Sequence, residues 1–268
     1  MVAVIAGNGL GLLGTSLQQL GMGLGGNAGL GRSGASQYVN VATGNLILQG
    51  QDERLIEQGL LAGLVRTYNS LGATGDVGSQ GGWLLGLDRK LGAVTGTLNA
   101  AGSTMTRDRG DGEEEVFTFD ATRGVYVAAN ESGADDTLQW NAATSTWTYT
   151  AGGSRNEETY NAGGQLIALT DGKSGAGYTL TYNANNQLMA VTASDGEALE
   201  LGYDGSGRVT SLSTLQIPPG GGTAVTKSRV TYGYDASGRL TSVTTDLTPD
   251  NATDSSVFTT TYTSHLGR

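Results

Sequence analysis

A glycine-rich motif near the start of the chain is the first group of residues that could support chemistry. The apolar residues 2–5 followed by a GxGxxG run over residues 9–14 fit a strand and a dinucleotide-binding loop. Such a loop also needs a helix that starts there and an acidic residue about 20 positions further on. The first acidic residue is Asp52, and no alternation of strands and helices follows. The sequence therefore argues against a nucleotide site.

Two acidic clusters could offer oxygen ligands to calcium. One lies at residues 108–115, and the other consists of Asp246, Asp250 and Asp254. Calcium loops place their ligands at defined spacings, and neither cluster matches the EF-hand or the nine-residue glycine–aspartate repeat. Solvated turns account for both clusters, so we predict no metal site.

Residues suited to nucleophilic or acid–base catalysis are scarce. The chain has no cysteine, which excludes disulfides, thiolate zinc sites and cysteine nucleophiles. Its one histidine, His265, lies three residues from the end of the given sequence and lacks the fixed neighbours that a general base requires. No pair of carboxylates stands out as a glycosidase pair. We therefore predict that the chain is not an enzyme and has no catalytic residue and no cofactor, with a hydrolase as the third alternative.

Composition and charge narrow the class of protein further. The formal net charge is −10, so the chain lacks the basic surface that nucleic acids and anionic membranes attract. It contains 45 glycines but only 3 prolines. This balance favours short strands joined by many tight turns, because glycine adopts the positive φ angles that turns require.

The texture of the sequence divides the chain into three parts. Residues 1–36 form a Gly/Leu-rich leader with no charged side chain before Arg32. We expect the leader to be flexible, because its glycines interrupt the apolar runs that a signal peptide or a membrane helix needs. Residues 37–110 are predicted to form a β-rich N-terminal segment. Residues 111–268 are predicted to form hairpin repeats.

The repeat consists of an aromatic residue, Asp or Asn, two small residues, Gly or Asn, Arg or Gln, and an aliphatic residue. Clear copies begin at residues 160, 182, 203 and 234, and weaker copies begin at residues 119 and 140. The steps between them are 21, 20, 22, 21 and 31 residues, and the longest contains a loop at residues 216–223. About 21 residues accommodate two strands and their turns. Because one hairpin cannot bury its apolar face alone, the sequence predicts an all-β array of antiparallel hairpins.

Each copy has the features of a tight hairpin turn. In the last copy, Asp235 can accept backbone hydrogen bonds, and Gly238 can adopt the left-handed conformation. This predicts a type I turn with a bulge that places Tyr234 opposite Leu240 on the inner face. Asp235 and Arg239 then form a solvated pair on the other face. The repeat-signature residues, to which we assign a structural role, are Tyr160, Tyr182, Tyr203, Asp204, Gly207, Arg208, Tyr234, Asp235, Gly238 and Arg239.

The repeat resembles the YD repeat of the Rhs family, which is related to the Tc-toxin shell components and the teneurins. The motif is complete at residues 203–209 and 234–240, whereas Asn and Gln replace Asp and Arg in the copies at 160 and 182. Residues 39–46 and 64–70 are also similar to the segment that opens the β-rich part of bacterial Rhs proteins. The resemblance covers roughly residues 38–240.

This resemblance implies a long sheet that spirals into a hollow cocoon around a C-terminal toxin domain. It implies a non-catalytic shell role, a secreted or cell-surface bacterial location, and the remainder of the shell or the toxin domain as partner. The Asp-Pro-x-Gly type motif that closes such shells is absent, and no toxin-like domain precedes Arg268. We therefore expect an N-terminal fragment whose open sheet edge favours self-association.

The alternative is an extracellular or cell-surface β-repeat module that binds carbohydrate or protein. In that interpretation, exposed tyrosines together with Trp140 and Trp147 would stack on sugars, or the open edge would pair with a partner strand. Nothing in the sequence favours nucleic acid as a partner.

Overall fold

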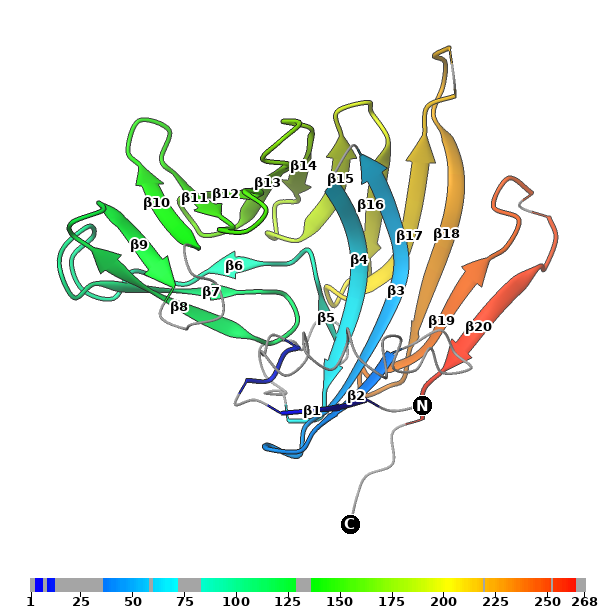
Figure 1. The fold of residues 1–268 in the computed structure, drawn as a ribbon. Coiled ribbons are helices and arrows are strands. Elements are labelled where there is room, and N and C mark those ends of the chain that lie inside the picture. The colour runs from blue at the N-terminus through cyan, green and yellow to red at the C-terminus, as the bar shows by residue number, and fades with distance from the viewer. Residues whose placement is uncertain are drawn as a thin grey trace.

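The computed structural model of the protein describes residues 3–6, 9–12, 36–57, 60–71, 83–128, 136–218, 220–251 and 253–263. These residues form two β-sheets and no helix (Figure 1). The predicted all-β array of antiparallel hairpins is therefore confirmed. Within the described ranges, no helix is long and apolar enough to cross a membrane.

The smaller sheet has five strands in chain order. Only its first two strands pair in parallel, and the other neighbours are antiparallel. The long β3–β4 hairpin dominates this sheet. Its strands are β1 (Ala3–Ile5), β2 (Ser36–Asn40), β3 (Leu46–Glu57), β4 (Leu60–Asn69) and β5 (Trp83–Leu85).

The larger sheet has fifteen strands, and each pairs antiparallel with the next strand in the sequence. This order is what consecutive hairpins produce. Its strands are β6 (Lys90–Leu91), β7 (Thr104–Asp108), β8 (Glu114–Asp120), β9 (Val125–Ala128), β10 (Thr137–Asn141), β11 (Thr146–Thr150), β12 (Glu157–Asn161), β13 (Leu166–Thr170), β14 (Gly177–Tyr182), β15 (Leu188–Ala193), β16 (Ala198–Tyr203), β17 (Val209–Gln216), β18 (Val225–Tyr234), β19 (Leu240–Asp246) and β20 (Val257–Thr261).

Alternating side chains build the core of the larger sheet. In β14, Tyr178 and Leu180 are buried, whereas Thr179 and Thr181 are not. The same alternation buries Leu199 in β16 and its counterparts in β11 and β18. A period of two places every second residue on the same face of a strand, so the inner face of these strands is apolar.

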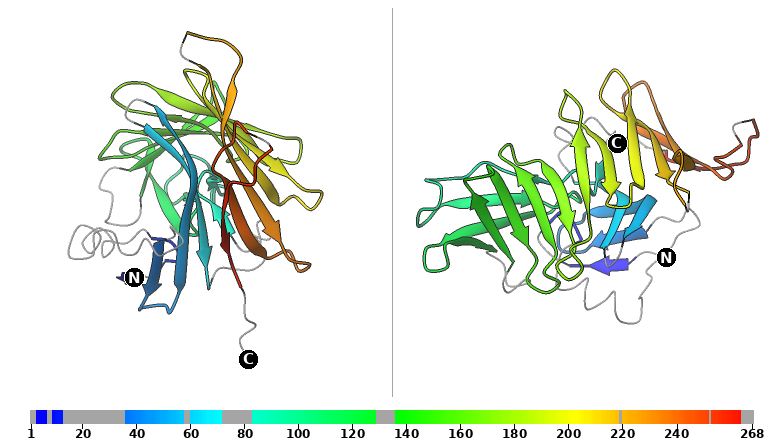
Figure 2. Two further views of the ribbon diagram at one scale, coloured as in Figure 1. Left: turned by 90° about the vertical axis from the view of Figure 1, so that its right-hand side faces the viewer. Right: turned by 90° about the horizontal axis from the view of Figure 1, so that it is seen from above.

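The larger sheet curls back on itself at its N-terminal end. The N–H of Leu91 in β6 donates to the carbonyl of Gly164 at 2.9 Å, and Lys90 bridges to Gln165. Both partners belong to the turn between β12 and β13. The first strand of the sheet therefore lies against a turn that is far along the array (Figure 2).

The smaller sheet packs inside the curve of β14–β18. The hydroxyl of Tyr178 in β14 donates to the carbonyl of Leu55 in β3 at 3.2 Å, and β3 also contacts β16. Buried residues of both sheets belong to one hydrophobic core. In the views of Figure 2, β3 and β4 cross the hairpin array, so this part of its concave face is filled by the chain's own residues.

The three-part division of the chain stays a prediction. Strands β6 and β7, which lie in the segment 37–110, belong to the larger sheet. Most of the leader, residues 1–36, lies outside the described residues. Within it, residues 3–5 form β1, and the backbone N–H of Gly11 donates to the carboxylate of Glu113 at 3.0 Å.

Candidate functional site

The repeat turns have the predicted geometry. The carboxylate of Asp204 accepts hydrogen bonds from the backbone N–H groups of Ser206 and Arg208, each at 2.9 Å. Gly207 has a φ of +80°, which is the left-handed conformation. The register shifts before Tyr203, because the strand carries a bulge there. Asp204 thus shapes the turn mainly by binding backbone groups.

The pairing across each turn places the aromatic residue opposite the aliphatic one. Tyr203 pairs with Val209, and Tyr234 pairs with Leu240. The copies that begin at Tyr160 and Tyr182 have the same pairing. The expected inward-facing apolar pair is therefore present in all four clear copies.

The charged pairs of the two complete copies differ in exposure: the side chains of Arg239 and Asp235 are 42% and 26% exposed, as expected of a solvated pair. The side chains of Asp204 and Arg208 are each 24% exposed and lie 2.7 Å apart. The Arg208 guanidinium also lies over the ring of Tyr234, 4.7 Å from its centroid. A cation over an aromatic face is attracted by the ring quadrupole, so Arg208 links its own repeat to the next one.

The amide copies reproduce these bonds without charge. The side-chain N–H of Asn183 donates to the amide oxygen of Gln187 at 2.8 Å, and the Asn183 oxygen accepts the backbone N–H of Gln187 at 3.0 Å. Asn161 and Gln165 make the same pair of bonds. Asn and Gln therefore preserve the turn where Asp and Arg are missing.

A ladder of tyrosine hydroxyls, which we call the tyrosine ladder, ties consecutive repeats together. The Tyr203 hydroxyl donates to the carbonyl of Leu188 at 2.7 Å, and the Tyr234 hydroxyl donates to the carbonyl of Val209 at 2.7 Å. Tyr182 bonds in the same way to the carbonyl that closes the copy before it. Each acceptor is the aliphatic residue that ends the preceding motif. The ladder was not predicted from the sequence, because a single motif does not show which carbonyl of the preceding copy its tyrosine contacts.

A buried ionic network, the Arg107 cluster, joins β7 and β8 to β12. It consists of Arg107, Glu115, Glu158, Arg89 and Tyr160. The Arg107 guanidinium donates to Glu158 at 2.7 and 3.0 Å and to Glu115 at 3.2 Å. Arg89 and Tyr160 donate short bonds to the same Glu158 carboxylate. The side chains of Arg107 and Glu158 are 3% and 7% exposed.

The ionisation of this cluster follows from its contacts. Burial alone would raise the pKa of Glu158, but the charges of Arg89 and Arg107 lower it to about 2. Burial raises the pKa of Glu115, although Arg107 opposes that rise. Burial and the neighbouring Glu158 raise the pKa of Tyr160. Each carboxylate is occupied by a protein partner, so the cluster serves packing and offers no free group to a substrate.

A second network, the Arg66 cluster, joins the two sheets. It consists of Arg66, Asp52, Trp83, Tyr232 and Tyr262. Arg66 pairs with Asp52 in a buried contact, and the Tyr232 hydroxyl donates to the same carboxylate at 2.6 Å. The guanidinium lies 4.8 Å from the centroid of the Trp83 ring. Burial tends to lower the pKa of Arg66, but the charge of Asp52 outweighs it and raises that pKa.

The acidic segment at residues 108–115 binds parts of the protein itself. Asp111 accepts the backbone N–H of Leu12 at 3.1 Å, and Glu113 accepts that of Gly11 at 3.0 Å. The GxGxxG run thus turns its backbone donors toward the protein's own carboxylates at the described residues 9–12. Gly14 of that motif lies outside the described residues.

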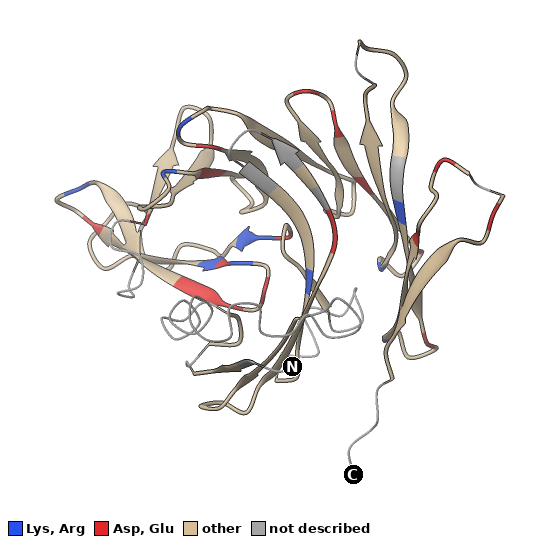
Figure 3. Ribbon diagram, turned by 45° about the vertical axis from the view of Figure 1, so that its right-hand side comes forward, with Lys and Arg blue, Asp and Glu red and all other residues tan. Residues whose placement is uncertain are grey.

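The remaining candidate residues are the second acidic cluster and His265. Asp254 accepts hydrogen bonds from Thr248 and Asn251, and within the described part of the chain no group of three or more acidic or histidine side chains could hold a metal ion. His265 lies outside the described residues. Figure 3 shows acidic residues on strands and in loops of the hairpin array.

The expectation that Trp147 stacks on sugars is wrong. Trp147 is only 4% exposed, because its ring packs between those of Tyr126 and Trp140 at centroid distances of 5.5 and 5.2 Å. Trp140 is itself partly buried against the core. The sequence pattern did not reveal this, since each tryptophan faces inward only once β10 and β11 pair.

A comparison with protein families identifies the repeat. Residues 136–247 match the family model described as Teneurin YD-shell. The match spans β10 to β19 and so includes all four clear copies of the motif. The resemblance to YD-repeat proteins is confirmed, and the chain contains a YD-repeat, shell-like structural module. No curated protein matches the chain.

Proposed function

We propose that the protein is a non-catalytic wall segment of a secreted bacterial toxin shell of the Rhs/YD-repeat type, and that it helps to enclose a C-terminal toxin domain. The observation that carries this proposal is the uninterrupted fifteen-stranded array of hairpins, whose central part matches a YD-shell family. An array of this kind extends by adding hairpins side by side. It is suited to forming a wall.

The buried polar clusters support a structural role. Both arginine-centred networks lie in the interior and are occupied by protein partners. Catalytic groups need access to a substrate, whereas these groups connect sheets and strands. The smaller sheet fills the concave face beside β14–β18, so we place the enclosed toxin against other parts of the wall.

The decisive experiment starts from the gene. Sequencing the locus beyond codon 268 is expected to show further Tyr-Asp repeats followed by a distinct domain. The complete gene product is then purified and treated with trypsin, and the distinct domain is expected to survive far longer inside the product than when it is expressed alone. Equal rates of digestion in the two forms would contradict enclosure. A frame without such a domain would contradict the toxin-shell role as a whole.

The proposed location has its own test. Antibody raised against the purified chain is used to compare culture medium and washed cells with lysed cells. Signal in the medium or on intact cells is expected. Signal found only after lysis, in growing cultures that display active secretion of other proteins, would contradict a secreted or cell-surface location.

A further inference from the structure

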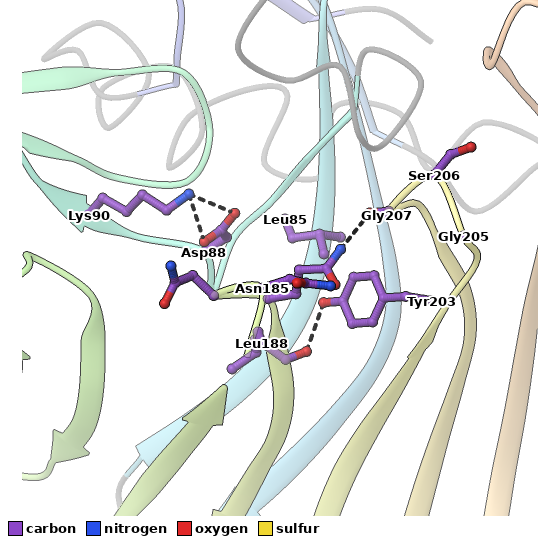
Figure 4. Close-up of a pocket in the computed structure, with 11 residues that line it drawn as sticks. Leu85, Asp88, Lys90, Asn185, Leu188, Tyr203, Gly205, Ser206 and Gly207 are labelled. Atoms are coloured by element: carbon purple, nitrogen blue, oxygen red, sulfur yellow. Dashed lines mark hydrogen bonds and ion pairs between the residues drawn. The ribbon is translucent and has the colours of Figure 1, made fainter. Parts of the chain in front are cut away.

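A polar pocket lies between the β5–β6 connection and two consecutive repeat turns (Figure 4). Its volume is about 520 Å³, which falls in the range of about 300–1,000 Å³ that small-molecule sites occupy. Asp88 from the connection and Lys90 at the start of β6 line one side, and the turns after β14 and β16 line the other. None of its lining residues belongs to either arginine-centred cluster, and its role does not depend on the proposed function.

The turn after β14 brings two free amides to this pocket. Asn185 and Asn186 are exposed, and within the described part of the chain their side chains have no hydrogen-bond partner. Asn186 has a φ of +60°, where the corresponding position of the next turn has Gly207. An L-residue is disfavoured in that conformation relative to glycine. The turn alone therefore does not require this side chain.

The rest of the lining adds a fixed ring and an exposed ion pair. Tyr203 is held in place by its hydrogen bond to the carbonyl of Leu188, so its ring lines the pocket in one orientation (Figure 4). The side chains of Asp88 and Lys90 are 43% and 53% exposed and lie 3.2 Å apart. An exposed pair is held weakly, so both groups can exchange their bond for one to a ligand.

These groups define the chemistry of a ligand. Amides and a carboxylate supply both donors and acceptors, and the aromatic ring supplies an apolar surface. One carboxylate and one ammonium group cancel in charge, so the pocket favours neither a phosphate nor a cation. A sugar ring matches this set, because it carries adjacent hydroxyl groups on its edge and C–H groups on its face. We propose that this pocket binds a neutral saccharide of one or two rings.

The test uses the purified chain on an array of neutral hexose and N-acetylhexosamine oligosaccharides, followed by titration calorimetry with the best glycan. Saturable binding is expected. The double variant Asn185→Ala/Asn186→Gly removes both amides but restores the glycine that the neighbouring turn has. It is expected to weaken binding roughly tenfold or more, as is Asp88→Asn.

A matched control comes from the last clear copy of the repeat, which begins at Tyr234. Ser237 occupies the place in its turn that Asn185 occupies in its own, but it does not line the pocket. Ser237→Ala is expected to leave the affinity within about twofold. The proposal is overturned if no neutral glycan binds saturably. It is also overturned if the double variant and Asp88→Asn, both folded by circular dichroism, bind as well as the unmodified chain.

Discussion

Replacing Glu158 by glutamine tests whether the Arg107 cluster holds the array together. The substitution keeps the size of the side chain and removes its charge. Arg107, whose side chain is 3% exposed, then faces a neutral amide where it had its bonds of 2.7 and 3.0 Å. Glu115 remains as its carboxylate partner at 3.2 Å. A buried cation that loses one partner is left partly uncompensated.

The structure sets the size of the effect. Breaking a buried ion pair by removing one partner costs about 3–5 kcal/mol. For a domain of this size, each kcal/mol lowers the melting temperature by about 2–4 °C, so we expect Glu158→Gln to lower it by roughly 6–20 °C. The free energy of unfolding is measured by urea titration followed by far-UV circular dichroism.

The pH dependence of unfolding gives an independent reading. The folded-state pKa of Glu158 is about 2, against an ordinary value of 4.5. Since the folded pKa is the lower one, the stabilisation is fully present above pH 4.5 and is lost as the pH falls toward 2. At about 1.4 kcal/mol per pKa unit, the loss is on the order of 3 kcal/mol. Burial raises the pKa of Glu115, so this residue acts in the opposite direction. It reduces the measured change of the free energy of unfolding with pH.

The control is Glu200→Gln, which removes a carboxylate from an exposed position in β16. Its free energy of unfolding is expected to stay within about 0.5 kcal/mol of the unmodified chain. The reasoning is refuted if Glu158→Gln costs no more than this control. It is also refuted if the loss of stability between pH 4.5 and 2 has the same size in Glu158→Gln as in the unmodified chain.

Three further changes test the turns, the tyrosine ladder and the contact between the sheets by the same urea titration. Tyr203→Phe removes one hydrogen bond of the tyrosine ladder and is expected to lower the free energy of unfolding by about 0.5–1.5 kcal/mol. An equal loss in the control Tyr68→Phe would count against the ladder. Gly207→Ala places a side chain on a residue with a φ of +80°, at a cost of about 1–2 kcal/mol. Its control Gly205→Ala adds a side chain in open space and is expected to be near neutral. Equal costs would disprove the turn assignment. Arg66→Met leaves the buried Asp52 carboxylate without its cation, although the Tyr232 hydroxyl still donates to it. This change is expected to cost about 3–5 kcal/mol, and a loss below about 1 kcal/mol would show that the cluster is dispensable.

The hairpin array could be predicted because its signal is local. The turn residues between Tyr203 and Val209 and the alternation before them determine strand, turn and register within one copy. Repetition of the copy then determines the order of strands, since each hairpin buries its apolar face against the next. The family match over residues 136–247 covers this part of the chain.

The contacts between distant segments could not be predicted in this way. Arg66 and Asp52 meet Tyr232 only because the smaller sheet packs inside the curve of the larger one. Arg107 and Glu158 are 51 residues apart, and nothing in either local sequence marks them as partners. The prediction that Trp147 is exposed was wrong for the same reason. Long-range pairing depends on the curvature of the sheet, which the local pattern does not contain.

The two rims of the hairpin array differ in how freely they can change length. Along one rim, the signature turns occupy residues 183–187, 204–208 and 235–239, and the tyrosine ladder ties each turn to the one before it. The connections at the other rim vary from residues 194–197 to residues 247–256. The extra residues between β17 and β18 lie on this second rim. Despite them, the Tyr234 hydroxyl still donates to the carbonyl of Val209. Insertions, tags and reporter peptides therefore belong on that rim, where added chain leaves the spacing of the repeats unchanged.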